Sequence, residues 1–317
     1  MTGLKEILWK ELSDCFNSKR FVVLFLLVYL AGIATVYIAS QNIRTVVDDQ
    51  TKYIFINLFT VSSSSNPFSF PLFMSLFIPI IGIALGFDAI NSERVSGNLS
   101  RLLAQPVYRD DVINGKFLSG VIMMSLMILS MVILVSGLGL RMIGVPPQAE
   151  EILRLFTFVV VSILYGAFWM ALAILFSTLF KKTSTSALTS IAIWLFLFLF
   201  ASVIAALIAG SVTHINNNQN PSVSDIMQFD SMFRMISRVS PSTLYSEVIQ
   251  GILLPSMGTS SPTMMIIGIY SGLNPTPLSL VQSLLIVWPQ IVALVALTAV
   301  CFAIAYIKFM REEIRAS

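Results

Sequence analysis

Long runs of apolar residues, separated by short polar segments, dominate the chain. Six of these runs are long enough to cross a hydrocarbon core of about 30 Å as α-helices, at a rise of about 1.5 Å per residue. They cover residues 21–39, 70–90, 117–140, 152–180, 187–209 and 284–307. Because a helix bonds its own backbone groups in lipid, the pattern predicts an all-α membrane protein with six transmembrane helices.

A shorter amphipathic pattern precedes the first run. Its apolar positions are spaced by three and four: Leu4, Ile7, Leu8, Leu12, Cys15 and Phe16. Such a pattern is typical of a helix that lies in the membrane interface, so we predict an interfacial elbow helix over residues 1–20. The apolar run that follows is longer than the roughly 7–15 residues of a signal-peptide core, so we interpret it as a retained first span.

Composition and charge agree with this interpretation. Of the 317 residues, 56% are hydrophobic and 11% are charged, whereas a soluble domain carries about 25% charged residues. With six spans, 13 of the 19 lysines and arginines flank the spans on the side that holds both termini. The positive-inside rule therefore predicts a multi-pass protein of the cell membrane with both termini in the cytoplasm.

The stretch before the last run is harder to interpret. Residues 210–283 begin with a polar run at 216–221 and then carry two apolar pieces, 244–254 and 264–270, each too short to cross alone. We predict an extracytoplasmic segment with surface-lying or re-entrant helices, inside a single transmembrane domain over residues 1–317. Glu247 either lines an exit pathway there or faces water.

The loop over residues 91–116 predicts a short amphipathic helix. One apolar face is formed at i, i+4, i+7 and i+8 by Val95, Leu99, Leu102 and Leu103, and a polar stripe is formed by Arg94, Asn98 and Arg101. Gly97 costs such a helix about 1 kcal/mol, so a break there is possible, and Pro106 ends it. A helix of this kind can insert into a groove of a partner protein, but a solvated basic loop that only sets topology fits equally well.

The residues of this loop resemble the ABC-2 type permeases. The motif is Glu93-Arg94-x-x-Gly97-x-Leu99-x-x-Leu102-Leu103-x-x-Pro106-Val107-x-Arg109, followed by Gly115-Lys116. Two weaker motifs are similar to the same family: Lys10-Glu11-x-x-Asp14 with Ser18-Lys19-Arg20-Phe21, and Ser240-Pro241-Ser242-x-Leu244-Tyr245. The layout resembles the six-span group that includes sodium-exporter-like and copper-enzyme-maturation permeases.

The resemblance implies a non-catalytic permease subunit of an ATP-driven transporter, and it favours export. Such permeases work as dimers, with a homodimer expected here, and with two separate ABC ATPase subunits that bind ATP and magnesium; this chain itself would need no cofactor. The loop helix would sit in a cleft of the ATPase. The ATPase-coupling residues implied are Glu93, Arg94, Gly97, Leu99, Arg101, Leu102, Pro106 and Arg109, with Asp88 and Lys116 as charges at the membrane edge.

Motifs of other chemistry are absent from the sequence. It has no G-x-x-x-x-G-K-[ST] phosphate loop and no G-x-S-x-G elbow, and its one histidine, His214, rules out an H-E-x-x-H zinc site. Cys15 and Cys301 fall on the side predicted to be reducing, so we expect neither a disulfide nor a metal site. Four methionines of the third run either pack or handle copper: Met123, Met124, Met127 and Met131.

Two other functions remain open at this point. A secondary transporter or channel would follow an ion gradient and ignore ATP, although the inverted repeats typical of that class are not visible. A membrane scaffold or sensor would use residues 210–283 as its binding surface. The pattern predicts contact with membrane lipid and no nucleic-acid partner, and it leaves the substrate undetermined.

Overall fold

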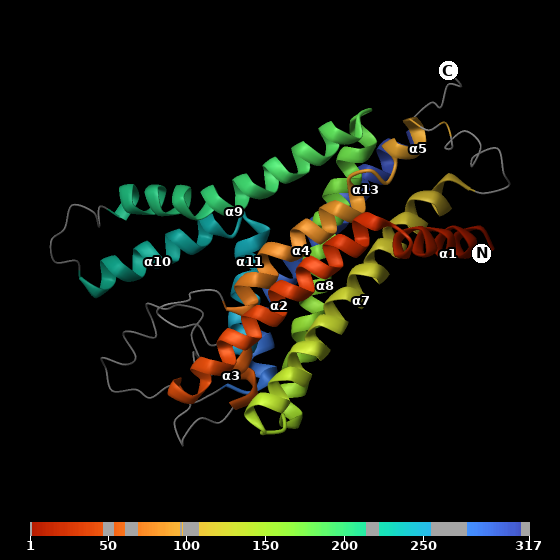
Figure 1. Cartoon of the computed structure of the whole chain (residues 1–317). Helices are drawn as coiled ribbons and strands as arrows, with labels where there is room; N and C mark the ends of the chain where they lie inside the picture. The colour runs from red at the N-terminus through yellow and green to blue at the C-terminus, as the bar shows by residue number, and fades with distance from the viewer. Residues whose placement is uncertain are drawn as a thin grey trace.

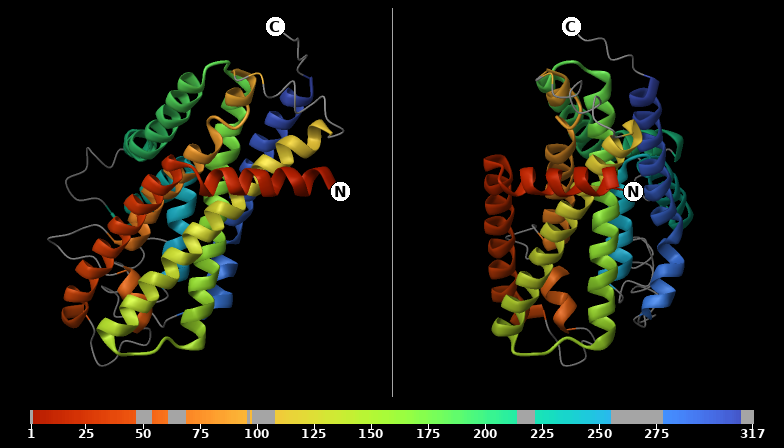
Figure 2. Two further views of the ribbon diagram at one scale, coloured as in Figure 1. Left: turned by 45° about the vertical axis from the view of Figure 1, so that its right-hand side comes forward. Right: turned by 90° about the vertical axis from the view of Figure 1, so that its right-hand side faces the viewer.

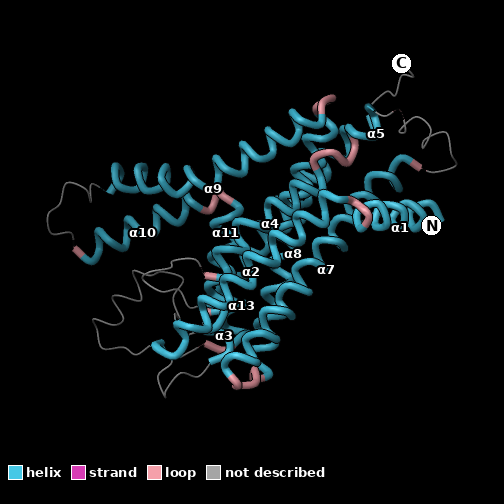
Figure 3. Tube along the Cα trace, viewed as in Figure 1, coloured by secondary structure: helices cyan, strands magenta, loops and turns pink. Residues whose placement is uncertain are grey.

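The computed structural model describes residues 2–46, 54–60, 69–95, 97, 108–213, 222–254 and 278–311. These residues are almost entirely helical and contain no strand (Figure 3). The helices are α1 Thr2–Phe16, α2 Lys19–Val46, α3 Ile54–Thr60, α4 Phe70–Gly86, α5 Asn91–Val95, α7 Arg109–Ile143, α8 Ala149–Leu179, α9 Thr183–Thr213, α10 Val223–Ser237, α11 Pro241–Leu253 and α13 Leu280–Arg311.

Five of the six predicted spans are confirmed as long apolar helices. Within the described part, five stretches are long and apolar enough to cross a membrane: Phe70–Val95, Arg109–Met142, Ala149–Leu179, Thr183–Thr213 and Leu280–Arg311. A sixth candidate joins α1 to the start of α2 through a bend of 64°. The all-α membrane fold predicted from the apolar runs is therefore confirmed.

Helix α8 forms the centre of the bundle. It packs against α4, α7, α11 and α13 (Figure 1). Three of its aromatic side chains, Phe158, Tyr165 and Trp169, are completely buried. Helix α4 lies especially close, because a Cβ added at Gly82 would lie 2.7 Å from the carbonyl oxygen of Gly166. Any larger residue at position 82 would push these two helices apart.

The bundle has two distinguishable ends. Helices α1 and α5 and the last turns of α13 lie toward one of them, which we call the terminal end (Figures 1 and 2). Helix α3 and the connection between α7 and α8 lie toward the other, which we call the distal end. Helix α1 runs across the bundle instead of along it, and it packs against α7 (Figure 2). Its predicted amphipathic character is visible in the burial of Ile7 and Leu12 and the exposure of Trp9.

Helices α9 and α10 form an arm that diverges from the bundle, and they lie side by side along much of their length (Figure 1). Only 11% of the most apolar stretch of α9 is buried by the described residues of the chain. Helix α10 begins with a capping box, in which Ser222 and Asp225 bond each other's backbone N–H groups.

Helix α11 is packed inside the bundle, not on its surface. Tyr245 is fully buried, stacks on Tyr165 at a ring-centroid distance of 4.3 Å, and shares a 2.8 Å hydrogen bond with the Ser162 hydroxyl. The Ser240 hydroxyl, just before α11, donates to the carbonyl oxygen of Leu197 at 3.2 Å. The second apolar piece at 264–270, like His214 and the polar run at 216–221, lies outside the described residues.

The methionines of the third span fill notches between helices. A Cβ added at Gly166 would lie 2.2 Å from the Met124 sulfur, and one added at Gly32 would lie 1.3 Å from the terminal methyl carbon of Met131. All four methionines of the stripe are buried. This geometry favours the packing interpretation, since methionine adapts its shape to irregular gaps.

Candidate functional site

The loop between the second and third spans starts from a firmly held helix, α5. The backbone N–H groups of Ile90 and Asn91 both donate to the Ser177 hydroxyl near the end of α8, at 3.0 and 3.1 Å. Val95 is the last residue of α5 and is 72% exposed. Gly97 follows in the left-handed region at φ +69°, a conformation that favours glycine. The possible break at Gly97 therefore coincides with an observed left-handed residue.

A buried lysine connects this helix to two others. The ammonium group of Lys116, on α7, lies 2.8 Å from a carboxylate oxygen of Glu11 on α1 and 2.8 Å from one of Glu93 on α5. The Lys116 side chain is only 6% exposed, and Lys10 adds a longer contact of 3.9 Å to Glu93. We call Lys116, Glu11 and Glu93 the charge joint, because they link three separate helices at the root of the loop.

The residue before Lys116 explains how the elbow helix comes so close. A Cβ added at Gly115 would lie 2.7 Å from a methyl carbon of Ile7, which is itself buried. Glycine at position 115 therefore admits α1 against α7, and the lysine that follows bonds its carboxylate. The Gly115-Lys116 pair noticed in the sequence has a concrete structural reason.

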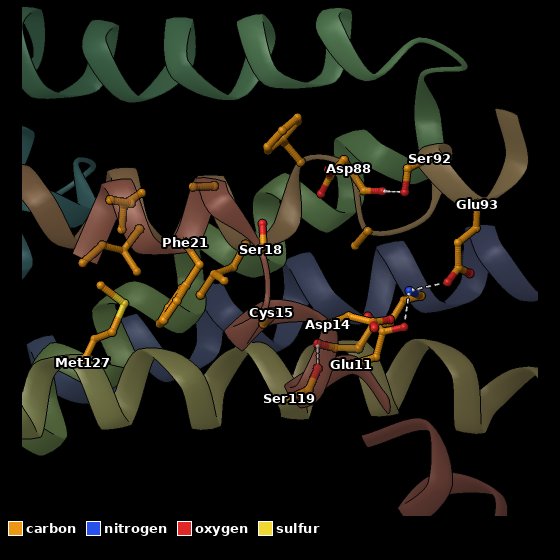
Figure 4. A pocket seen from close by; sticks show the side chains of 17 residues that line it. Glu11, Asp14, Cys15, Ser18, Phe21, Asp88, Ser92, Glu93, Ser119 and Met127 are labelled. Carbon is orange, nitrogen blue, oxygen red and sulfur yellow. Dashed lines mark hydrogen bonds and ion pairs between the residues drawn. The ribbon is translucent and has the colours of Figure 1, made fainter. Parts of the chain in front are cut away.

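A cavity of about 320 Å³ lies beside the charge joint (Figure 4). Its walls come from α1, the start of α2, the end of α4, α5 and α7. The charged groups that line it are four carboxylates and one ammonium: Glu11, Asp14, Asp88, Glu93 and Lys116. Their sum is negative, so the cavity favours cationic or neutral contents over anions. Among the described residues, no group of three or more histidine, cysteine, aspartate or glutamate side chains is arranged to hold a metal ion.

Cys15 also lines this cavity and reflects its environment. Burial, together with the nearby Glu11 carboxylate, raises the pKa of the Cys15 thiol to about 11. The thiol is therefore protonated at neutral pH, which makes it a poor nucleophile. Neither Cys15 nor Cys301 forms a disulfide.

The structure brings together three of the residues singled out in the sequence. Asp88, Glu93 and Lys116 line the same cavity. Arg94 follows Glu93 on α5, and Arg109 is the first residue of α7. The other coupling candidates lie outside the described residues: Leu99, Arg101, Leu102 and Pro106.

Sequence reasoning missed two partners at this site. Glu11 and Ser177 were not predicted as site residues, although both hold the root of the loop in place. The sequence motif Lys10-Glu11-x-x-Asp14 could have pointed to Glu11. No sequence pattern pointed to Ser177.

A second buried cation lies at the distal end. Arg154, on α8, is fully buried and donates to the carbonyl oxygens of Ile252 and Leu278, both at 2.6 Å, and to the Glu150 carboxylate at 2.9 Å. These bonds tie α8 to the end of α11 and the start of α13. Arg154 is the only charged residue in the apolar run 152–180, which was the sequence signal for it.

Glu247, the predicted pathway candidate, lies neither in the cavity beside the charge joint nor in the cluster around Arg154. Its carboxylate accepts hydrogen bonds from Arg238 at 2.9 Å and from the Gln290 amide at 2.9 Å. The Glu247 side chain is 10% exposed and that of Arg238 is 41% exposed. Glu247 therefore belongs to a polar cluster between α11, α13 and the end of α10.

These features define a class: a multi-pass helical membrane protein with an amphipathic helix across one end and a charged joint at the root of a loop. The sequence model of the ABC-2 family transporter proteins matches residues 6–314, and the chain belongs to this family. It is also 30% identical, over 122 residues, to the probable ABC transporter permease protein NosY of Pseudomonas aeruginosa. That similarity covers 38% of this chain and 43% of the relative.

Proposed function

We propose that this chain is the permease subunit of an ATP-driven exporter, which works as a homodimer with two ABC ATPase subunits. The ATPases hold ATP and magnesium, and the loop over residues 91–116 docks into them. The complex resides in the cell membrane with the terminal end and both chain termini in the cytoplasm. One observation carries the proposal: the charge joint links the root of this loop to the elbow helix and to a spanning helix.

The charge joint lets a movement of the loop reach the spanning helices. A movement of α5 pulls on α7 through the bond between Glu93 and Lys116, and on α8 through the bonds to Ser177. Because Lys116 is buried, these bonds are stronger than the same contacts would be in water. A displacement of the loop is therefore passed to two spanning helices instead of being lost in side-chain motion.

We also divide the proposed coupling residues into two groups. The Glu93 carboxylate points to Lys116, so we assign Glu93 to holding α5 on the membrane helices. Arg94 and the residues beyond Gly97 then form the docking surface, in which Leu99 and Leu102 fill the ATPase cleft and arginines set the orientation by charge pairing.

A double variant, Leu99→Asp with Leu102→Asp, tests the docking surface. Two carboxylates on the apolar face cannot enter a hydrophobic cleft without a large desolvation cost, so the ATPase should no longer co-purify with the permease. Membrane insertion should be unchanged. The measurement is affinity purification of the full chain from membranes, followed by mass spectrometry and an ATPase assay.

A matched pair of charge reversals serves as the control. Arg94→Glu at the terminal end should abolish coupled ATPase activity, whereas Arg141→Glu, an exposed position at the distal end of α7, should leave it at the wild-type level. Wild-type amounts of ATPase bound to the double variant would refute the docking role of the loop. Transport that follows an ion gradient without any ATPase would instead favour a secondary transporter.

A further inference from the structure

The cavity beside the charge joint has a polar end and an apolar end. Glu11 and Glu93 lie at one end of the lining, and Phe21 and Met127 lie at the other (Figure 4). All of the lining residues belong to a single copy of the chain. At about 320 Å³, the cavity is at the small end of the roughly 300–1,000 Å³ range of ligand pockets. It therefore has room for one small molecule with a polar part and an apolar part.

The lining of the cavity carries more negative than positive charge. Of its four carboxylates, those of Glu11 and Glu93 are bonded to Lys116. The carboxylate of Asp14 makes no hydrogen bond or ion pair within the described part of the chain. A second positive charge in the cavity would therefore be stabilised by these carboxylates.

Lys116 retains one hydrogen-bond donor that the described residues do not use. An ammonium group has three N–H donors, and Lys116 donates two of them, one to Glu11 and one to Glu93. Its side chain is only 6% exposed and lines the cavity. A buried donor without an acceptor destabilises the fold, so an oxygen atom placed in the cavity beside Lys116 would be bound there. This unmet hydrogen bond is independent of the excess of carboxylates.

An organic cation fits this lining better than a metal ion does. In the described part of the chain, no three histidine, cysteine, aspartate or glutamate side chains are grouped so as to ligate a metal. An ammonium group needs no such convergent set, because its charge interacts with one carboxylate at hydrogen-bond distance and with the others at longer range. Phe21 and Phe87 also line the cavity, and aromatic rings attract ammonium groups as well as apolar ones.

We propose that this cavity binds a small amphiphilic amine. Its ammonium group lies at the Asp14 and Asp88 carboxylates, a neighbouring oxygen atom accepts the third N–H of Lys116, and its apolar group lies against Phe21 and Met127. The bound amine therefore connects the elbow helix α1 to the spanning helices α2 and α7. The inference goes beyond the proposed permease function, and its test needs no ATPase.

Matched probes test the binding by isothermal titration calorimetry of the full chain in a non-ionic detergent. Phenylalaninol carries an ammonium group, a hydroxyl group and a phenyl ring. In 3-phenylpropane-1,2-diol a second hydroxyl group replaces the ammonium group, and phenethylamine lacks the hydroxymethyl group. We expect phenylalaninol to bind roughly tenfold more tightly than the diol and about threefold more tightly than phenethylamine. Equal affinities of phenylalaninol and the diol, or no binding of either, would overturn the proposal. Equal affinities of the two amines would overturn the oxygen contact to Lys116.

Variants of the lining test where the probes bind. Asp14→Asn removes an exposed carboxylate that bonds no described residue, so the fold should be kept. It should weaken the binding of phenylalaninol about threefold and leave that of the diol unchanged. Glu6→Gln, at an exposed position of α1 outside the cavity, is the matched control and should change neither affinity. Ala84→Leu narrows the cavity from α4 and should weaken the binding of both probes. Unchanged affinities in both Asp14→Asn and Ala84→Leu would overturn the site.

A membrane aminolipid and a soluble amine share this chemistry, and a change of lipid distinguishes them. The titration is repeated with the chain in nanodiscs of phosphatidylcholine, and again after part of this lipid is replaced by phosphatidylethanolamine, whose ammonium group keeps its N–H donors. If the aminolipid is the occupant, the replacement should weaken the apparent affinity for phenylalaninol. If a soluble amine is the occupant, the affinity should be the same in both nanodiscs. No binding of phenylalaninol in either nanodisc would overturn the site.

Discussion

Among the described residues, each end of the bundle buries one cation, but the two ends hold it in different ways. Arg154, at the distal end, is fully buried and bonds two backbone carbonyl oxygens and a carboxylate from its own helix. Lys116, toward the terminal end, bonds only side chains, and both of its carboxylate partners come from other helices. A cavity of about 320 Å³ lies beside Lys116.

From this difference we infer which end moves when the proposed transporter works. Its bonds to backbone carbonyl oxygens hold the Arg154 side chain in one position. To break these bonds, the end of α11 or the start of α13 would have to shift as a unit. Bonds between flexible side chains beside an open space allow Lys116 to follow a displaced partner. We therefore interpret the distal cluster as an anchor and the charge joint as the place where movement enters the spans.

Replacing Arg154 should have the largest effect. Arg154→Met leaves two carbonyl oxygens and the Glu150 carboxylate without their donor, and breaking a buried pair in this way costs about 3–5 kcal/mol. We expect little folded protein in the membrane, measured by fluorescence-detected gel filtration and thermal inactivation in detergent. Arg141→Met, at an exposed position of the same end, should behave as the wild type. Wild-type stability of Arg154→Met would show that the bonds of Arg154 do not anchor the distal end.

Replacing Lys116 should reduce stability less than replacing Arg154 does, but it should abolish the coupling of ATPase activity to the permease. In Lys116→Met two partly buried carboxylates lose their partner, but both are 13–17% exposed and border the cavity, so water can solvate them and the loss should be about 1–3 kcal/mol. ATPase activity should no longer respond to assembly with the permease.

The triple variant Lys116→Met, Glu11→Gln, Glu93→Gln separates stability from coupling. Removing all three charges should restore most of the thermal stability, because no charge then lacks a partner, while coupling stays lost. Recovery of coupled ATPase activity in this variant would show that the charge joint transmits nothing.

The smallest expected effect is on the reactivity of Cys15. Because its pKa is raised to about 11, its thiolate fraction at neutral pH is lower than that of a free cysteine. In a Cys301→Ser background, its alkylation rate should keep rising up to about pH 11, whereas an ordinary thiol with a pKa of about 8.5 levels off earlier. Lys116→Met should slow the reaction further, since the ammonium lowers the pKa of this thiol. A rate that levels off near pH 8.5 would mean that neither burial nor the Glu11 carboxylate raises the pKa of this thiol.

Local pattern alone was enough to identify the helices and the family. The apolar runs predict the long helices because the cost of exposing backbone to lipid depends only on the residues of each run. The spacing of residues 4–16 predicts the amphipathic α1, and the loop motif by itself indicates an ABC-2 permease. The same reasoning places a possible break at Gly97, where the backbone is left-handed.

Only the tertiary structure decided which charges meet. Glu11 and Lys116 are 105 positions apart, and Glu247 and Gln290 are 43 apart, so no periodicity of the chain relates them. Arg154 lies near the start of the apolar run 152–180, yet its bonds join three helices. The segment that forms α11 was predicted to be surface-lying or re-entrant, and it packs in the core. The physical reason is that helix formation is a local matter, whereas the pairing of buried charges depends on how separate helices pack against one another.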